Sequence, residues 1–194
     1  MKLFAIGAAA LVSFAATSAM AQAQGPASHG AAIPGMCVYF NQLAMAQSTA
    51  GQAVQARMEQ LAQEVQGEIA PYATSLQSDF QALQASASTL PADQLNQRRQ
   101  ALQQRAQEAQ VLEQTRDAEL RYTLAEQRRK ISEAIEPILI AVYQENSCSI
   151  LIDRESAFLV NPAMDVTPTV IQRLNAALPT LSFNRMPVPA QPQS

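Results

Sequence analysis

The sequence predicts a mainly α-helical protein with a small β-containing body, from which a long antiparallel helical hairpin protrudes as an arm. Three observations lead to this fold class. The 194 residues are rich in Ala and Gln, which suit helices, and include only 6 Gly. Apolar residues recur with a helical period over a long central stretch. Short runs of strand-forming residues stand at both ends of that stretch.

The first 21 residues have the features of a secretory signal peptide. A basic start, Met1-Lys2, precedes an apolar run over residues 3–12, and Ala19-Met20-Ala21 is a typical cleavage signature. The apolar run is too short to span a bilayer. We therefore expect cleavage near Ala21 and export of a mature chain with 13 − 1 = 12 basic and 16 acidic residues.

The mature chain begins with a small, polar stretch and then a strand. Residues 22–34 are interrupted by Gly and Pro, which predicts a flexible leader. The single histidine, His29, lies there and is expected to be solvated. Residues 35–40, GMCVYF, predict a buried strand, and helical sequence begins near Asn41. We assign residues 35–50 to the body.

Residues 51–134 are expected to form the arm. Between residues 54 and 83 the apolar positions follow one another at a mean step of about 3.6, the period of a nearly straight helix. Pro71 should kink that helix. Residues 86–93 break the pattern and predict a tight reversal at the arm tip, with Pro91 as the first residue of the second helix.

The second helix is expected to extend from Pro91 to Glu145. Its apolar stripe is patchy at first, nearly absent over residues 113–119, and strong again toward the body, with an interruption at Pro137. The half of the arm that includes the tip should therefore be thinly packed.

Residues 135–178 complete the predicted body. Residues 149–153 and 157–160 are expected to be two strands joined by a turn at 154–156. A last helix follows and ends near Leu178. Its expected N-cap is Thr167 and its expected first residue is Pro168. The Pro-rich residues 179–194 predict a disordered tail.

Such a monomer would leave apolar surface exposed, which predicts oligomerisation through the sheet. In the two strands, side chains alternate between the faces, so one set should face a shared core. The residues expected at this interface are Met36, Val38, Phe40, Ile150 and Ile152.

The two cysteines lie in or beside the predicted strands. Cys37 is in the opening strand and Cys148 stands just before the next one. If those strands are neighbours, an exported protein could form a disulfide between them. The alternative is two small buried apolar residues.

Composition and spacing argue against several classes of function. One histidine and two distant cysteines do not make a metal site, and the formal charge of −3 argues against binding nucleic acid. No nucleophile has a suitable histidine partner, and no Gly-rich phosphate loop is present. We expect a binding protein with no cofactor and no enzymatic activity.

Two blocks of sequence resemble the Skp/OmpH family of periplasmic chaperones. They are residues 36–53, MCVYFNQLAMAQSTAGQA, and residues 148–175, CSILIDRESAFLVNPAMDVTPTVIQRLN. The resemblance implies a homotrimer whose body forms the trimer interface. Its three arms would enclose unfolded outer-membrane proteins in the periplasm without ATP or a cofactor. The alternative is a structural or adaptor coiled coil of the cell envelope.

Two departures from the family pattern concern charge. Phe40 stands where the family commonly has Asp, and the mature chain is acidic, whereas the best-known members are basic. The acidic charge argues against strong electrostatic capture of clients. It leaves only a weak contact with a membrane surface or lipopolysaccharide as a further partner.

The expected client-binding surface is the apolar stripe near the arm tip, with three arginines beside it. Over residues 79–105 these arginines outweigh two aspartates, whereas the whole arm has 9 basic and 11 acidic residues. Clients should therefore be held mainly by apolar contact. The residues are Tyr72, Leu76, Phe80, Leu83, Leu95, Arg98, Arg99, Leu102 and Arg105.

Overall fold

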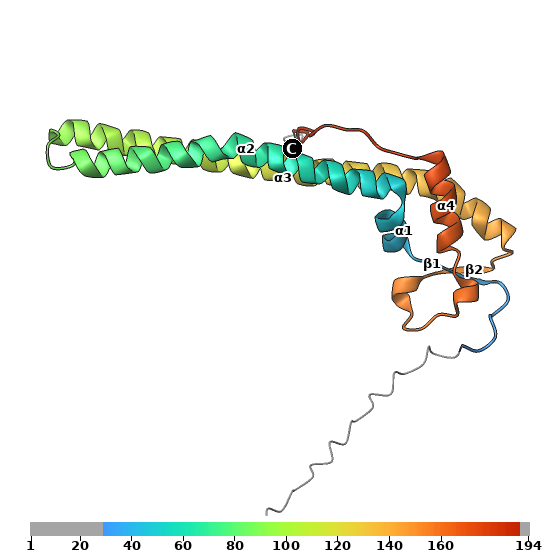
Figure 1. Ribbon diagram of the computed structural model, residues 1–194. Helices are drawn as coiled ribbons and strands as arrows, with labels where there is room; N and C mark the ends of the chain where they lie inside the picture. The colour runs from blue at the N-terminus through green and yellow to red at the C-terminus, as the bar shows by residue number, and fades with distance from the viewer. Residues whose placement is uncertain (1–28, 191–194) are drawn as a thin grey trace, which may run out of the picture. The chain divides into compact units, whose positions relative to one another are not determined.

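The computed structural model describes residues 29–190, so the predicted signal peptide at residues 1–21 lies outside the described residues. Figure 1 shows two long helices side by side as an arm, with the strands and shorter helices gathered at one end of it as a body. The predicted fold class is confirmed. The elements, in order, are β1 (Met36–Tyr39), α1 (Asn41–Gln47), α2 (Thr49–Ser86), α3 (Ala92–Glu145), β2 (Ile150–Asp153), the 3-10 turns η1 (Arg154–Ser156) and η2 (Pro162–Met164), and α4 (Thr167–Ala177).

The sheet of the body has two parallel strands. Met36 pairs with Ile150, and Val38 pairs with Ile152, so the whole arm is the crossover between the strands. An isolated parallel bridge between Val38 and Asp165 occupies the other edge of β1. The free edge of β2 therefore has no partner strand within the described residues.

The predicted strand at residues 157–160 is wrong. The preceding residues wind into η1, where Asp153 Oδ1 accepts a hydrogen bond from the backbone N–H of Glu155 at 2.9 Å. Arg154 Nη1 donates to the carbonyl of Ala157 at 2.6 Å, which keeps the chain turning away from β2. The apolar run is left exposed, and Phe158 has a relative exposure of 102%.

The arm is formed by α2 and the first part of α3. The 38 residues of α2 give a length of about 57 Å, and the helix continues through Pro71. Within the turn, the backbone N–H groups of Thr89 and Leu90 both donate to the carbonyl of Ser86 at 3.1 Å. α3 begins at Ala92, so Pro91 is its N-cap and not its first residue as predicted.

Packing between the arm helices fades from the body toward the tip. The buried residues of α2 end at Val65, and those of α3 begin at Thr123. Beyond these two positions, no arm residue in the described range is buried. The predicted thin packing of the outer half is thus observed.

The predicted N-cap of the last helix is also wrong. α4 begins at Thr167, after Val166 as N-cap, so Pro168 is its second residue. Thr167 Oγ1 accepts a hydrogen bond from the backbone N–H of Phe40 at 2.8 Å, and its own N–H donates to Asp165 Oδ1 at 2.8 Å. The hydroxyl therefore joins two distant segments.

The expected disorder of residues 179–194 does not describe residues 179–190, and residues 191–194 lie outside the described residues. After α4 the chain returns in an extended conformation along the arm (Figure 1). Leu181 and Phe183 pack against the hydrophobic core.

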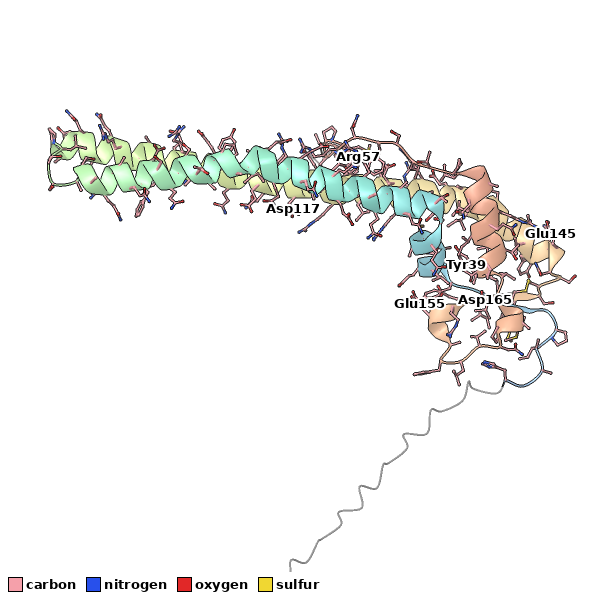
Figure 2. All side chains as sticks on the ribbon, in the orientation of Figure 1. Tyr39, Arg57, Asp117, Glu145, Glu155 and Asp165 are labelled. Carbon is pink, nitrogen blue, oxygen red and sulfur yellow. A yellow bond between two sulfur atoms is a disulfide. The ribbon has the colours of Figure 1, made fainter. Side chains whose placement is uncertain are left out.

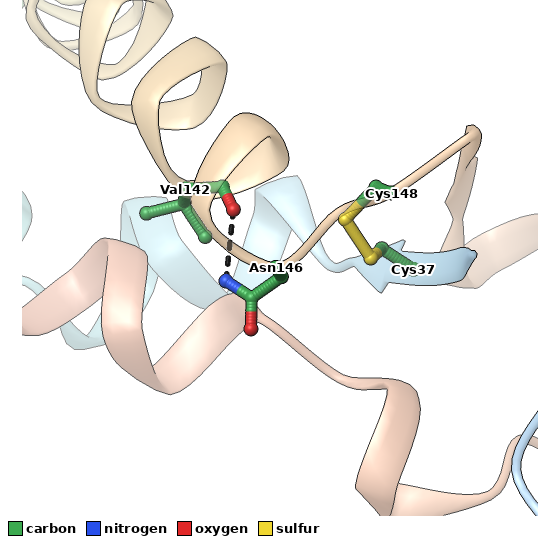
Figure 3. Close-up of a disulfide and its surroundings, with 4 residues drawn as sticks. All are labelled: Cys37, Val142, Asn146 and Cys148. Atoms are coloured by element: carbon green, nitrogen blue, oxygen red, sulfur yellow. Dashed lines mark hydrogen bonds between the residues drawn. A yellow bond between two sulfur atoms is a disulfide. The ribbon is translucent and has the colours of Figure 1, made fainter. Parts of the chain in front are cut away.

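A disulfide joins Cys37 of β1 to Cys148, two residues before β2 (Figure 3). The two Cα atoms are 5.7 Å apart, and the bond closes a loop across a sequence separation of 111 residues. Beside it, Asn146 Nδ2 donates to the carbonyl of Val142 at 2.8 Å, and the same carbonyl accepts the backbone N–H of Asn146 at 3.1 Å.

Candidate functional site

The outer half of the arm presents large apolar side chains to solvent. Tyr72 has a relative exposure of 48% and Phe80 one of 51%, both on α2. A surface helix normally keeps such side chains on its packed face. Here the partner helix covers them only in part, because two helices cannot enclose a stripe as a bundle does. The half-buried members of the predicted site are Leu76, Leu83, Leu95 and Leu102.

The tip arginines divide into two kinds. Arg105 of α3 forms an ion pair with Asp79 of α2, which joins the helices and balances its charge. Arg98 and Arg99 are exposed and form no salt bridge within the described residues. The structure thus leaves two of the three predicted arginines to act as free charges.

A shallow hollow lies where the predicted apolar and basic residues meet. Its volume is about 270 Å³. Side chains from both helices line it, and the predicted residues among them are Leu83, Arg98, Leu102 and Arg105. The structure therefore brings these four together in one place, whereas Tyr72 does not line this hollow.

One exposed apolar residue of the arm escaped the sequence analysis. Val111 of α3 is 61% exposed, more than Tyr72 or Phe80. It directly precedes Leu112, which is half-buried, and two consecutive apolar residues cannot both face the partner helix. The two adjacent apolar residues, Val111 and Leu112, were therefore the sequence signal that one of them would be exposed.

The predicted interface residues do not have equal access to solvent. Val38 is 1% exposed and belongs to the core of the protomer, so it is not available to a partner chain. Ile150 is 50% exposed. Met36, Phe40 and Ile152 are half-buried. Alternation along the strands thus identified one exposed residue and one core residue.

A larger apolar hollow of the body was missed. It has a volume of about 540 Å³ between α3 and the sheet, and Leu139, Ile140 and Leu151 are among its lining residues. Ile140 is 52% exposed. The run Ile138-Leu139-Ile140 was the available signal, because apolar residues all around a helix require burial on more than one side.

Tyr39 lines this hollow, and its phenol has a raised pKa. Burial, and secondarily the charge of Asp153, raises the pKa of the Tyr39 phenol to about 12. The phenol is therefore neutral at physiological pH and donates a hydrogen bond to Asn41 Oδ1 at 3.2 Å. This bond joins the last residue of β1 to the first residue of α1.

The part of the chain that the structure describes contains neither a group of metal ligands nor a helix that could cross a membrane. Among residues 29–190, no three His, Cys, Asp or Glu side chains are grouped so that they could hold a metal ion. Nor does any helix in that range combine the length and the apolar character needed to cross a membrane.

Comparison with known proteins identifies the family. Residues 35–174 match the OmpH-like outer membrane protein family. The chain belongs to the OmpH-like family. A crystal structure of an OmpH-like protein from Caulobacter crescentus CB15, described as an outer membrane chaperone, is 34% identical, with a TM-score of 0.77. The match covers 84% of this chain and 96% of that chain. Among curated proteins, none matches.

Membership of the OmpH-like family supports a chaperone role, and the family is typically non-enzymatic. The matched range includes the whole arm and both strands of the body. It ends at residue 174, before the end of α4, so the extended segment beyond α4 lies outside it.

Proposed function

We propose that this protein is an ATP-independent holdase chaperone of the periplasm, which binds unfolded outer-membrane β-barrel proteins between helical arms and prevents their aggregation. The observation that carries the proposal is the partly exposed apolar stripe on the outer arm, in a chain of the OmpH-like family. Unfolded β-barrel precursors have alternating apolar side chains, which such a stripe can contact at many weak points.

The thin packing of the arm supports weak, reversible holding. The outer half has no buried side chain in the described range, so clients can contact several half-exposed residues without displacing a core. Many weak contacts allow release without an energy source, because no single contact determines the residence time. A structural coiled coil would instead be expected to bury its stripe continuously.

We further propose a homotrimer held by the body. The apolar hollow beside α3 and the open edge of β2 would be covered by neighbouring protomers. The exposed apolar residues available for this are Ile140, Ile150, Phe158 and Leu159. Covering them would remove an apolar surface that soluble monomers seldom present.

The experiment is an aggregation assay with a urea-unfolded outer-membrane porin diluted into buffer. We expect the purified mature protein to keep the porin soluble, with saturation near one client per three chains. A matched control is a soluble folded protein, which should not bind. If the porin aggregates at the same rate with and without the protein, the proposal is wrong, and tight binding of one folded envelope protein would instead support an adaptor.

A further inference from the structure

The segment that follows α4 makes an ordered connection along the root of the arm, the part nearest the body (Figure 1). Arg57 of α2 holds it first: Nε donates to the carbonyl of Phe183 at 3.1 Å and Nη2 to Asn184 Oδ1 at 3.3 Å. Figure 2 labels Arg57 on the part of α2 that this segment passes. We call residues 181–186 the strap.

Arg185 connects the strap to both arm helices at once. Its Nη2 lies 2.9 Å from Glu68 Oε1 on α2, and its Nε lies 3.0 Å from Glu119 Oε2 on α3. Arg116 of α3 pairs with the same two carboxylates, at 2.7 and 3.0 Å. Four charges thus form a closed ring over α2, α3 and the strap.

The ring is better shielded from water than the other ion pairs of the described arm. The Arg185 and Glu119 side chains are 20% and 13% exposed, whereas those of the nearby pair Arg121–Asp117 are 80% and 55% exposed. Shielding strengthens an ion pair, because the surroundings screen it less. The hydrogen bond from Arg185 is the main reason that the pKa of the Glu68 carboxyl lies below its ordinary value.

Met186 supplies partners to two polar side chains of α3 that are fully buried. The backbone N–H of Met186 donates to Thr123 Oγ1 at 2.8 Å, and Gln127 Nε2 lies 3.8 Å from its sulfur. Thr123 and Gln127 are both 0% exposed, on an arm whose other glutamines are in solvent. Buried polar groups need such partners, so these two residues fit a covered surface and not a bare coiled coil.

We propose that the strap clamps α2 and α3 together at the root of the arm, so that opening and bending of the hairpin are confined to the part beyond Glu68 and Arg116. The strap ends where buried packing ends, since Val65 and Thr123 are the last buried residues toward the tip. Stability differs along a structure according to such local contacts. The strap lies outside the range of the family match, and its action does not depend on client binding.

One donor of the strap is left without a partner in the described structure. Arg185 Nη1 is buried with no hydrogen-bond partner among the described residues, which offsets part of the stabilisation from the ion pairs. Prolines follow the strap at positions 187 and 189. Residues 187–190 form no hydrogen bond or ion pair within the described part of the chain. The polar contacts of the strap are thus limited to Phe183, Asn184, Arg185 and Met186. Leu181 and Phe183 also pack against the hydrophobic core, so deletion of the strap removes apolar contacts as well.

Hydrogen exchange of the mature protein without client tests the proposal. Truncation after Thr180 removes the strap, and truncation after Pro187 removes only residues beyond it. In the shorter chain we expect amides of residues 61–68 and 119–127 to exchange about tenfold faster, because local opening becomes easier. Amides of the tip should not change, and the chain truncated after Pro187 should match the full chain.

A pair of point variants separates the strap from general destabilisation. Arg185→Gln should accelerate exchange over the same two ranges, whereas Arg173→Gln, which breaks an ion pair with Glu145 outside the strap, should not. Should truncation after Thr180 prevent folding, Arg185→Gln decides. Unchanged rates at residues 61–68 and 119–127, or equal acceleration along the whole arm including the tip, would overturn the proposal.

Discussion

The hydroxyl of Thr167 accepts a hydrogen bond from the backbone N–H of Phe40, 127 residues earlier, at 2.8 Å. Phe40 is the N-cap of α1 and Thr167 is the first residue of α4, so this bond ties the starts of two helices together. Thr167 is 0% exposed, and water cannot replace it as the acceptor.

We predict that Thr167→Val destabilises the protein while Thr167→Ser does not. Valine keeps the shape of threonine but removes the acceptor of the partly buried Phe40 N–H, at a cost of about 1–3 kcal/mol. Serine retains the acceptor. Urea unfolding followed by circular dichroism measures the difference, and equal midpoints for Thr167→Val and the parent would contradict it.

The apolar stripe should carry client binding. We predict that Leu76→Ser with Phe80→Ser weakens porin protection about tenfold, or ~1.4 kcal/mol, while assembly is unchanged. Phe80 is half exposed and lies where no side chain of the arm is buried, so its loss should not unfold the helix. The matched control is Gln77→Ser with Gln81→Ser, two exposed residues of the same turns. Equal protection by both double variants would show that the stripe does not hold the client.

Charge should contribute less than apolar contact. At about 0.5 M salt the Debye length is roughly 4–5 Å, so contacts through exposed arginines are screened. We predict that this salt concentration weakens client binding only slightly. Arg98→Gln with Arg99→Gln should likewise cause only a small loss of client affinity. Arg105→Gln should have less effect on the charge offered to clients, since Asp79 already balances Arg105. Fluorescence titration with a labelled porin at two salt concentrations measures this, and loss of most affinity in high salt would reverse the assignment.

The disulfide should stabilise the body. In the chain-entropy model a closed loop of about 110 residues contributes about 4–5 kcal/mol, and the separation of Cys37 and Cys148 is 111 residues. We predict that Cys37→Ser with Cys148→Ser lowers the free energy of unfolding, measured in urea, by a corresponding amount. Reductant should lower the urea midpoint of the parent but not that of the variant. Two free thiols in non-reduced, exported protein by mass spectrometry would contradict the pairing.

An ion pair between α3 and α4 should make stability depend on pH. Arg173 donates hydrogen bonds to the Glu145 carboxylate and holds the pKa of that group below its ordinary value of 4.5. Because the folded pKa is the lower one, the stabilisation is present above pH 4.5 and is lost as the pH falls through the folded value. We predict that Glu145→Gln narrows the difference between the urea midpoints at pH 7 and pH 3. The control is Glu155→Gln, at an exposed residue that forms no ion pair within residues 29–190, and it should leave that difference unchanged.

The helical arm was predictable because helices are specified by neighbouring residues. The step of about 3.6 between apolar positions, the break at residues 86–93 and the polar run at 113–119 are all local signals. They gave the two long helices, the tip and the thin packing of the outer half. The candidate client-binding residues lie on these helices, so most of that site followed from the same periodicity.

Pairing over long distances was decided only in three dimensions. Residues 157–160 have the composition of a strand, but η1 turns them away from β2, whose outer edge has no partner strand among the described residues. Likewise, the sequence predicts that Thr167 is the N-cap of its own helix. In the folded chain its hydroxyl instead accepts a hydrogen bond from the backbone N–H of Phe40. Local propensity cannot distinguish such competing partners.

The sequence by itself determined that this protein is a helical hairpin on a small body, because apolar spacing acts over neighbouring turns. Only the tertiary structure decided what happens to the segment after α4, whose prolines alone predicted disorder. Arg185 finds Glu68 on one helix and Glu119 on the other, and Met186 finds Thr123. Those partners are 63 to 117 residues away, and only folding of the arm brings them to one place.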